Sequence, residues 1–319
     1  MEKNKENLRL PIIDLSNYFG VKATEDSKKD VLEKWFNAFS TIGFAILNNS
    51  GVNNSSIKAL DVSARSFFEQ ANYLKCKFSH GKYGLGGYTP VGIESVGRSL
   101  NTALLTNTNT EKPDPVESFV FKNGGHPPDL QPENPMTFVP AVKTYWKEME
   151  KLLAERILPI SAISLGLPKN YFNNFYHCEG GRLGNNSLRL AFYPSVDKDT
   201  NKCVTRYGAH TDYMGFTLLR ADPIISGLEV LFPNGNWVEV PPLSGNSIII
   251  NSGDLIKRWT NDVWNSALHR VKINSTKSRL SLVFFTGPKE ETLVEPLPIN
   301  GPPHYAPVLV KNHLNEKIK

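Results

Sequence analysis

The sequence lacks several features that would place it in a common class of protein. It has only three cysteines in 319 residues, and Cys76, Cys178 and Cys203 are widely spaced with no Cys-x-x-Cys pair. This pattern argues against a disulfide framework or a zinc knuckle and is typical of free or buried thiols in a reducing compartment. No window approaches the roughly 18 consecutive apolar residues of a membrane span. The charged start MEKNKENLRLP also lacks the apolar segment of a signal peptide. We therefore expect a soluble, cytoplasmic protein with no membrane partner.

The charge is only modestly unbalanced. The net charge of +5 comes from 36 basic and 31 acidic residues scattered along the chain, and no basic run interleaves with aromatic residues. This distribution argues against a nucleic-acid partner. A mildly basic protein suits an acidic small molecule, although solubility explains the balance equally well. Arg98 and Arg206 favour a carboxylate-bearing small-molecule substrate.

The first half of the chain has a helical pattern. Apolar residues recur at helical spacing in 27–41, with Ser27 as the expected N-cap, in 55–69 and in 140–165, which Gly166 ends. Between 79 and 136 the sequence is rich in glycine, proline, asparagine and threonine, so we expect irregular loops that cover a site as a lid. Residues 1–166 are therefore interpreted as a helical region with lid-like loops that packs on a core.

The second half, residues 167–319, changes to short runs with a period of two. LRLAFYP, GFTLLRA, GLEVLFP, NWVEVPP, NSIIINSG, ALHRVKI and RLSLVFFTG are separated by turn residues at intervals of about ten. This pattern predicts a sandwich or jelly-roll barrel. We expect one compact, mainly β unit with a helical N-terminal part.

The stretch YGAHTDY places His210 and Asp212 two residues apart. Residues i and i+2 of a strand point to the same face, so the imidazole and the carboxylate could chelate one metal ion. A lone His-x-Asp pair often arises by chance. The alternative is a polar strand edge, where the two side chains pair with each other or with solvent.

A third candidate ligand, His269, lies in the apolar run SALHRV. By itself it would be a buried core histidine with hydrogen-bonded ring nitrogens. Two histidines and one carboxylate, however, form the facial triad of non-haem iron(II) oxygenases, which leaves metal positions open for substrates. Zinc also accepts these ligands, but no obvious general base stands beside the triad.

Arg279 and Ser281 form another i, i+2 pair in the apolar run RLSLVFF. Burying an arginine there is costly unless an anion meets it, and the guanidinium suits a carboxylate. The partner could be a bound dicarboxylate that also chelates the metal. It could instead be a carboxylate of the fold, such as Asp254 or Glu239.

These motifs together resemble the iron(II)- and 2-oxoglutarate-dependent dioxygenases, in the isopenicillin N synthase-like branch. LPIIDLS resembles the family's opening strand, GFAILNNSGV its Gly-Phe segment, and the stretch from Gly227 to Asp262 its long signature between ligands. The resemblance implies a double-stranded β-helix, or jelly-roll, in 167–319.

The resemblance also implies roles for individual residues. It makes His210, Asp212 and His269 the iron ligands, and makes Arg279, Ser281 and Tyr193 the group that binds the far carboxylate of 2-oxoglutarate. One position departs from the family, because many relatives have asparagine where this chain has Ala191. Alternation along the last strand places Phe285 on the face of Arg279, where it could line the substrate pocket. Leu219 could do so too, or both could simply fill the barrel.

The implied reaction couples oxidative decarboxylation of 2-oxoglutarate, giving succinate and CO2, to oxidation of a small molecule. That oxidation could be hydroxylation, desaturation or cyclisation, in secondary metabolism. Fe(II), 2-oxoglutarate and O2 take part, and ascorbate helps to keep the iron reduced. Two alternatives remain open: an iron oxidase of the same fold that does not use 2-oxoglutarate, and a non-catalytic jelly-roll that binds a small molecule or partner.

Overall fold

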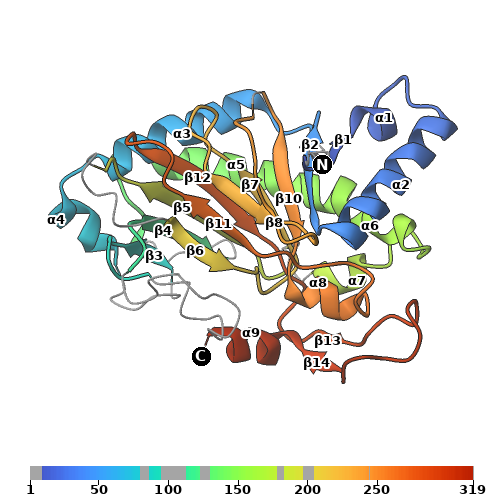
Figure 1. Cartoon of the computed structure of the whole chain (residues 1–319). Helices are drawn as coiled ribbons and strands as arrows, with labels where there is room; N and C mark the ends of the chain where they lie inside the picture. The colour runs from blue at the N-terminus through green and yellow to red at the C-terminus, as the bar shows by residue number, and fades with distance from the viewer. Residues whose placement is uncertain are drawn as a thin grey trace, which may run out of the picture.

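Two β-sheets form the centre of the protein in the computed structural model, which describes residues 9–79, 86–94, 113–122, 130–177, 183–196, 205–243 and 245–318. The strands are β1 (Ile12–Asp14), β2 (Phe44–Asn48), β3 (Gly87–Thr89), β4 (Glu117–Lys122), β5 (Ser187–Tyr193), β6 (Thr205–His210), β7 (Phe216–Arg220), β8 (Leu228–Leu231), β9 (Trp237–Glu239), β10 (Ile248–Ser252), β11 (His269–Lys272), β12 (Arg279–Phe285), β13 (Leu293–Val294) and β14 (Val308–Leu309). The larger sheet has the order β1-β2-β10-β7-β12-β5-β4-β3, and the smaller has the order β6-β11-β8-β9 (Figure 1). β13 and β14 pair separately. This double sheet confirms the predicted jelly-roll.

The first 166 residues contribute strands to both edges of the larger sheet. β2 pairs with β10 at one edge, and β4 pairs with β5 at the other. The expectation of a helical first half omitted β3 and β4, because they lie within the stretch rich in loop-forming residues. Much of the expected lid (80–85, 95–112 and 123–129) lies outside the described residues. The division at residue 166 stays a prediction, and the two regions share one sheet.

The helices are α1 (Ser16–Phe19), α2 (Glu25–Thr41), α3 (Asn54–Phe68), α4 (Asn72–Lys75), α5 (Phe138–Leu152), α6 (Leu158–Ser164), α7 (Asn173–Tyr176), α8 (Asp254–Trp259) and α9 (Val310–Ile318). The N-cap of α2 is Thr24, not Ser27, which instead completes a capping box with it. α5 passes through a π-helical turn (Leu153–Ile157) into α6. Pro159 follows this turn and has no N–H to donate to the preceding turn, which accounts for the widening.

Side-chain alternation along β12 separates a core from a site. Leu280, Leu282 and Phe284 belong to the main hydrophobic cluster, which also contains buried residues of the helices. α3 and α5 lie along that face of the larger sheet (Figure 1). The opposite face carries Arg279 and Ser281 and lines a cavity between the sheets.

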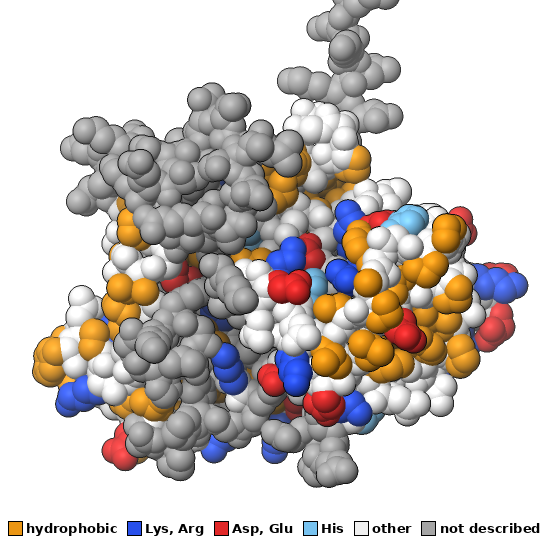
Figure 2. Space-filling view, turned by 90° about the horizontal axis from the view of Figure 1, so that it is seen from below, with side chains coloured by type: hydrophobic (Ala, Val, Ile, Leu, Met, Phe, Trp, Pro, Cys, Tyr) orange, Lys and Arg blue, Asp and Glu red, His pale blue; other side chains and the backbone are white. Residues whose placement is uncertain are grey.

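The described surface has a mixed character. The face that is lowest in Figure 1 carries acidic and basic side chains next to one another (Figure 2). Among the described residues, no helix is both long and apolar enough to cross a membrane. Cys76 is an exposed free thiol, while Cys178 and Cys203 lie outside the described residues.

Candidate active site

His210 and His269 are brought together by strand pairing. His210 ends β6 and His269 begins β11, and the two residues lie opposite each other in an antiparallel register. Their ring centroids are 4.2 Å apart. Two histidines that are distant in the sequence therefore face one point because the sheet aligns them.

Backbone carbonyls orient both imidazoles. The Nδ1 atom of His210 lies 2.9 Å from the Gly208 carbonyl oxygen, and that of His269 lies 3.1 Å from the Ala267 oxygen. A carbonyl only accepts hydrogen bonds, so each Nδ1 carries the proton and each Nε2 keeps a free lone pair. Both Nε2 atoms lie 3.8 Å from the Oδ1 atom of Asp212. With Nδ1 bonded to a carbonyl, Nε2 is the ring nitrogen of each histidine that is placed to bind a metal.

Asp212 is held by two residues that the sequence pattern did not single out. Its Oδ2 atom accepts hydrogen bonds from the Thr217 hydroxyl at 2.5 Å and from the Asn251 amide at 2.7 Å. These bonds leave Oδ1 directed at the two histidines. The only available signal was that Thr217 and Asn251 are polar residues inside apolar strands.

The turn that carries Asp212 is tied to the start of α8. The backbone N–H groups of Gly253 and Asp254 donate to the carbonyls of Gly215 and Asp212, both at 2.8 Å. A Cβ atom on Gly253 would lie only 2.6 Å from the Met214 oxygen, so the close approach requires glycine.

Electrostatics favour a cation at this point. Burial, together with the neighbouring His269, lowers the pKa of His210 to about 3, so His210 is neutral. Burial alone would raise the pKa of Asp212, but the neighbouring histidines and the two hydrogen bonds hold it below its usual value. The Asp212 carboxylate is therefore a buried anion that faces the Nε2 atoms of His210 and His269. One ligand atom from each residue lies within 4.8 Å of the others, a donor set that suits a divalent transition metal.

Arg279 is the first residue of β12, on the face of the larger sheet that lines the cavity. It is buried, with 1% of its surface exposed. Its Nη1 atom donates to the Ser281 hydroxyl at 2.5 Å, and its guanidinium carbon lies 5.2 Å from the centre of the Tyr193 ring. In the described part of the chain, the arginines within 4.0 Å of a carboxylate are Arg65, Arg189 and Arg270.

Neither alternative partner for Arg279 is engaged with it. Asp254 instead accepts from Thr211 and Lys317, and Glu239 accepts from Asn274. The buried guanidinium is thus available for an anion from outside the fold.

One cavity of about 280 Å³ contains all the residues predicted for the site. Its lining includes His210, Asp212, His269, Arg279, Ser281, Tyr193, Phe285 and Leu219. Leu219 also packs against a hydrophobic cluster that spans the two sheets, so it both lines the cavity and fills the barrel.

Comparisons with known proteins agree with this geometry. The 2OG-Fe(II) oxygenase superfamily profile matches residues 184–288, and the profile "non-haem dioxygenase in morphine synthesis N-terminal" matches residues 10–141. The chain is a member of the 2OG-Fe(II) oxygenase superfamily. This confirms the resemblance seen in the sequence. The protein is an Fe(II)- and 2-oxoglutarate-dependent dioxygenase.

Individual relatives align with most of the length of the oxygenase. Homoarginine-6-hydroxylase from Glycine max is 29% identical over 97% of this chain and 96% of its own length. Gibberellin 2-beta-dioxygenase 2 from Arabidopsis thaliana is 29% identical over 82% of this chain and 72% of its own length. A full-length Neurospora crassa protein, solved in complex with alpha-KG and thymine, is 26% identical. The structural alignment covers 99% of this chain and 98% of the Neurospora crassa chain, with a TM-score of 0.81.

The oxygenase closes its cavity with the C-terminal helix α9. Leu314 of α9 lines the cavity, and the Nε2 atom of His313 lies 2.8 Å from the Tyr213 carbonyl. Lys317 pairs at 2.6 Å with Asp254, which in turn accepts from Thr211. α9 therefore contacts Tyr213 directly and is linked to Thr211 through Asp254, which no sequence pattern indicated.

Arg206 does not belong to the site of the oxygenase. It is 1% exposed and donates to the backbone carbonyls of Tyr193, Ser275 and Lys277. These bonds tie loops together, so Arg206 no longer supports an acidic substrate. Arg98 lies outside the described residues.

Proposed function

We propose that His210, Asp212 and His269 hold the Fe(II) of this oxygenase, and that Arg279, Ser281 and Tyr193 bind the distal carboxylate of 2-oxoglutarate. The observation that carries the proposal is the shared cavity. Three atoms that could bind a metal lie within 4.8 Å of one another. Arg279, which has no carboxylate of the described residues within 4.0 Å, is buried and lines the same space. A keto acid with a second carboxylate matches this arrangement, because its keto-acid end can bind the metal and its second carboxylate can bind the arginine.

Each residue has a distinct task in this proposal. Bound Fe(II) with 2-oxoglutarate and O2 supplies the oxidising power that removes hydrogen from a C–H bond of the substrate. The carbonyl-bound imidazoles keep their protons on Nδ1, so they bind as neutral ligands. Asp212 supplies the negative charge, which Thr217 and Asn251 orient. Arg279 and Ser281 fix the cosubstrate at a defined distance from the metal.

The substrate side of the cavity supports a small-molecule substrate. Val283 and Phe285 continue the inward face of β12, and Leu314 stands on α9. Lys122 and Arg189 line the same cavity, and the charge of Arg189 is balanced by Glu94 at 2.6 Å. Glu290 in turn acts electrostatically on Lys122. We infer a substrate with an apolar body and a carboxylate, handled in the cytoplasm as part of secondary metabolism.

The test has two stages. Anaerobic addition of Fe(II) and 2-oxoglutarate to the purified protein should produce a weak visible charge-transfer band. A panel of small molecules then identifies the substrate by stimulated succinate release in air. The panel takes its first members from the names of similar proteins: gibberellins, homoarginine and thymine. Absence of both the band and succinate would overturn the proposal.

A second candidate has a specific observation behind it. 1-aminocyclopropane-1-carboxylate oxidase 3 from Cucumis melo is also 29% identical, over 90% of this chain and 81% of its own length. The sequence features alone did not separate this kind of oxidase from a 2-oxoglutarate-dependent enzyme. Substrate oxidation without stoichiometric succinate would favour it. A metal-independent protein without turnover would instead indicate a non-catalytic binding jelly-roll.

A further inference from the structure

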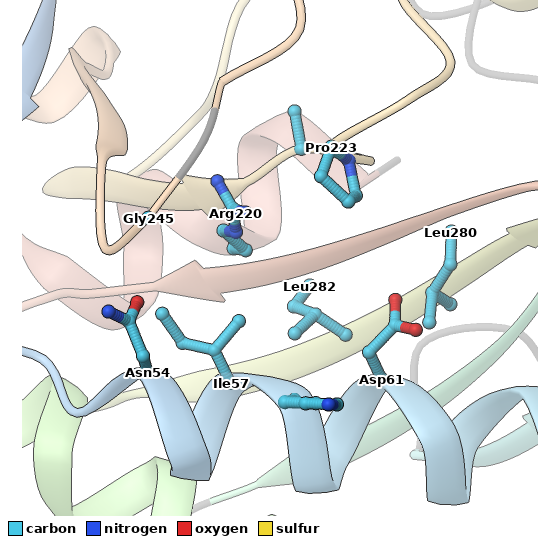
Figure 3. Close-up of a pocket in the computed structure, with 10 residues that line it drawn as sticks. Asn54, Ile57, Asp61, Arg220, Pro223, Gly245, Leu280 and Leu282 are labelled. Carbon is cyan, nitrogen blue, oxygen red and sulfur yellow. The ribbon is translucent and has the colours of Figure 1, made fainter.

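A second cavity of about 240 Å³ lies on the opposite side of the larger sheet, against α3. Figure 3 shows Asn54, Ile57 and Asp61 on α3 facing Leu282 of β12, with Arg220 and Pro223 on the far side of the strand. The proposed function makes no use of this cavity. Leu280 and Leu282, which line it, alternate along β12 with Arg279 and Ser281, so the two cavities share one strand.

Arg220 is the unusual residue of this cavity. Its side chain is 6% exposed, and it lies next to Leu219, which faces the active site. Its Nη1 atom donates to the carbonyls of Leu243 at 2.9 Å and Ser247 at 3.4 Å, while its buried Nε atom has no hydrogen-bond partner among the residues that the structure describes. Arg220 is not among the described arginines that lie within 4.0 Å of a carboxylate.

Such a residue is costly unless it meets an anion. Two other buried arginines are more fully paired than Arg220. Arg189 has the carboxylate of Glu94, and Arg206 donates to three carbonyls through Nη1 and Nη2, whereas both carbonyl contacts of Arg220 come from Nη1. Arg279 lacks a carboxylate as well, and it faces the cosubstrate cavity. Arg220 therefore resembles Arg279 in being a buried cation that lines a cavity.

Asp61 and Asp222 act electrostatically on Arg220, but neither carboxylate lies within 4.0 Å of it and both have other partners. Asp222 accepts from Arg65 and from the backbone N–H groups of Ile224, Ile225 and Leu280. Asp61 lies on the same cavity wall, but Arg65 binds both of its carboxylate oxygens, at 3.0 and 3.3 Å. Lys58 adds a second positive charge at the rim. The hydroxyl of Tyr145, which interacts electrostatically with Arg220, is also buried without a hydrogen-bond partner.

The inner wall of the cavity is apolar, because Ile57, Leu280 and Leu282 are all buried and Ala221 and Pro223 adjoin them. Asn54 and Lys58 also line the cavity, but both are exposed, so Arg220 is the buried donor among its lining residues. A phosphate dianion needs several donors around it, whereas one buried guanidinium beside an aliphatic wall matches a carboxylate on a short hydrocarbon body.

We propose that this cavity is a second binding site, for a small aliphatic carboxylate whose charged group meets Arg220 and whose body lies against Leu280, Leu282 and Ile57. The site is separate from the cosubstrate cavity and does not depend on the roles proposed there.

The test uses the full-length protein with Fe(II) and saturating 2-oxoglutarate under anaerobic conditions, so that the active site is already supplied with its own carboxylate. Calorimetric titration compares hexanoate with the neutral hexanamide and with inorganic phosphate. We expect saturable 1:1 binding of hexanoate, and at least about tenfold weaker binding of the other two. Equal binding of hexanamide would overturn the role of Arg220, and tighter binding of phosphate would overturn the ligand class.

Two variants locate the binding. Arg220→Met should weaken hexanoate binding at least about tenfold while the melting temperature stays the same or rises, because a buried unpaired charge is removed. A large fall in melting temperature would instead indicate that Arg220 serves to hold Leu243 and Ser247. Ile57→Phe keeps Arg220 and fills the cavity, so it should also abolish binding. Unchanged hexanoate binding in both variants would sink the proposal, whatever the state of the iron site.

Discussion

The hydroxyl of Thr217 donates to the Asp212 carboxylate oxygen that is turned away from the two imidazoles, at a distance of 2.5 Å. The bond crosses from β7 to the turn after β6. It determines which oxygen of Asp212 faces His210 and His269.

We expect Thr217→Val to lower Fe(II) affinity about 10–100-fold, because loss of a partner that orients a metal ligand typically has this effect. Valine matches threonine in shape, so the fold should be kept. Anaerobic Fe(II) titration measures the change. Thr89→Val is the matched control, since Thr89 lines the same cavity without a bond to Asp212. Equal affinities in the two variants would contradict the role given to Thr217.

Arg279→Ala should raise the KM for 2-oxoglutarate by at least about 30-fold, since removing one partner of a buried charge pair costs about 2–5 kcal/mol. Fe(II) affinity should stay within about threefold of the parent. Arg279 begins β12, whereas Thr217, which holds Asp212, pairs with Phe285 at the end of that strand. Ser281→Ala removes one hydrogen bond and should have a smaller effect, less than about tenfold. An unchanged KM in Arg279→Ala would return that arginine to a structural role.

Metal removal should destabilise the protein. A ligand that binds only the folded state at 100 times its Kd stabilises it by about 2.7 kcal/mol. Anaerobic Fe(II) should therefore raise the melting temperature of chelator-treated protein, and Asp212→Ala should lose this increment together with turnover. A variant that still gains stability from Fe(II) would show that the metal binds elsewhere.

Gly253→Ala should impair iron binding although it replaces none of the proposed ligand side chains. The new Cβ atom would lie 2.6 Å from the Met214 oxygen and 2.9 Å from the Asp212 oxygen, so the turn that carries Asp212 must shift. Gly235→Ala is the control, since its Cβ atom meets nothing within 4 Å although its φ of +81° makes alanine unfavourable there. Fe(II) titration and thermal melting of both variants separate a local effect on the site from a general loss of stability. Parallel losses of Fe(II) affinity would count against the steric explanation.

Leu314→Trp should raise the KM for the substrate while the Fe(II)–2-oxoglutarate charge-transfer band is kept, because the larger side chain narrows the cavity from α9. Asn315→Ala, an exposed neighbour on the same helix, is the control. Steady-state kinetics with the identified substrate measures the effect. If neither substitution alters the KM, Leu314 does not contact the substrate.

Local patterns in the sequence were enough to predict the period-two strands and the pairing of His210 with Asp212. They also placed Arg279 and Ser281 on one face, because alternation in a strand is a local property. Tertiary partners were not predictable in this way. In the sequence, Thr217 and Asn251 look like isolated polar residues. Their role is visible only when β7 and β10 lie beside the turn that carries Asp212. Leu314 is far from that turn in the sequence, so no periodicity connects them.

The sequence was also a poor guide where one residue type has several common partners. Arg206 was interpreted as a contact for an acidic substrate, but it satisfies backbone carbonyls within the fold. A buried arginine has the same appearance in the sequence whether its partner is a ligand, a carboxylate or a carbonyl. The location of Arg220 beside a cavity likewise became visible only when α3 was packed against β12.

The strands at the two edges of the larger sheet have a consequence for how the molecule folds. Ile46 of β2 pairs with Ile249 of β10, so about two hundred residues separate the partners of one ladder. Contacts of such long range make folding slow, since the chain must close a large loop before the pairing stabilises it. A fragment that begins at residue 167 would leave β10 and β5 with unpaired edges that invite aggregation. We therefore expect residues 167–319 not to fold on their own. Chimaeras between relatives should fold best when the strands that pair across residue 166, β2 with β10 and β4 with β5, come from the same parent.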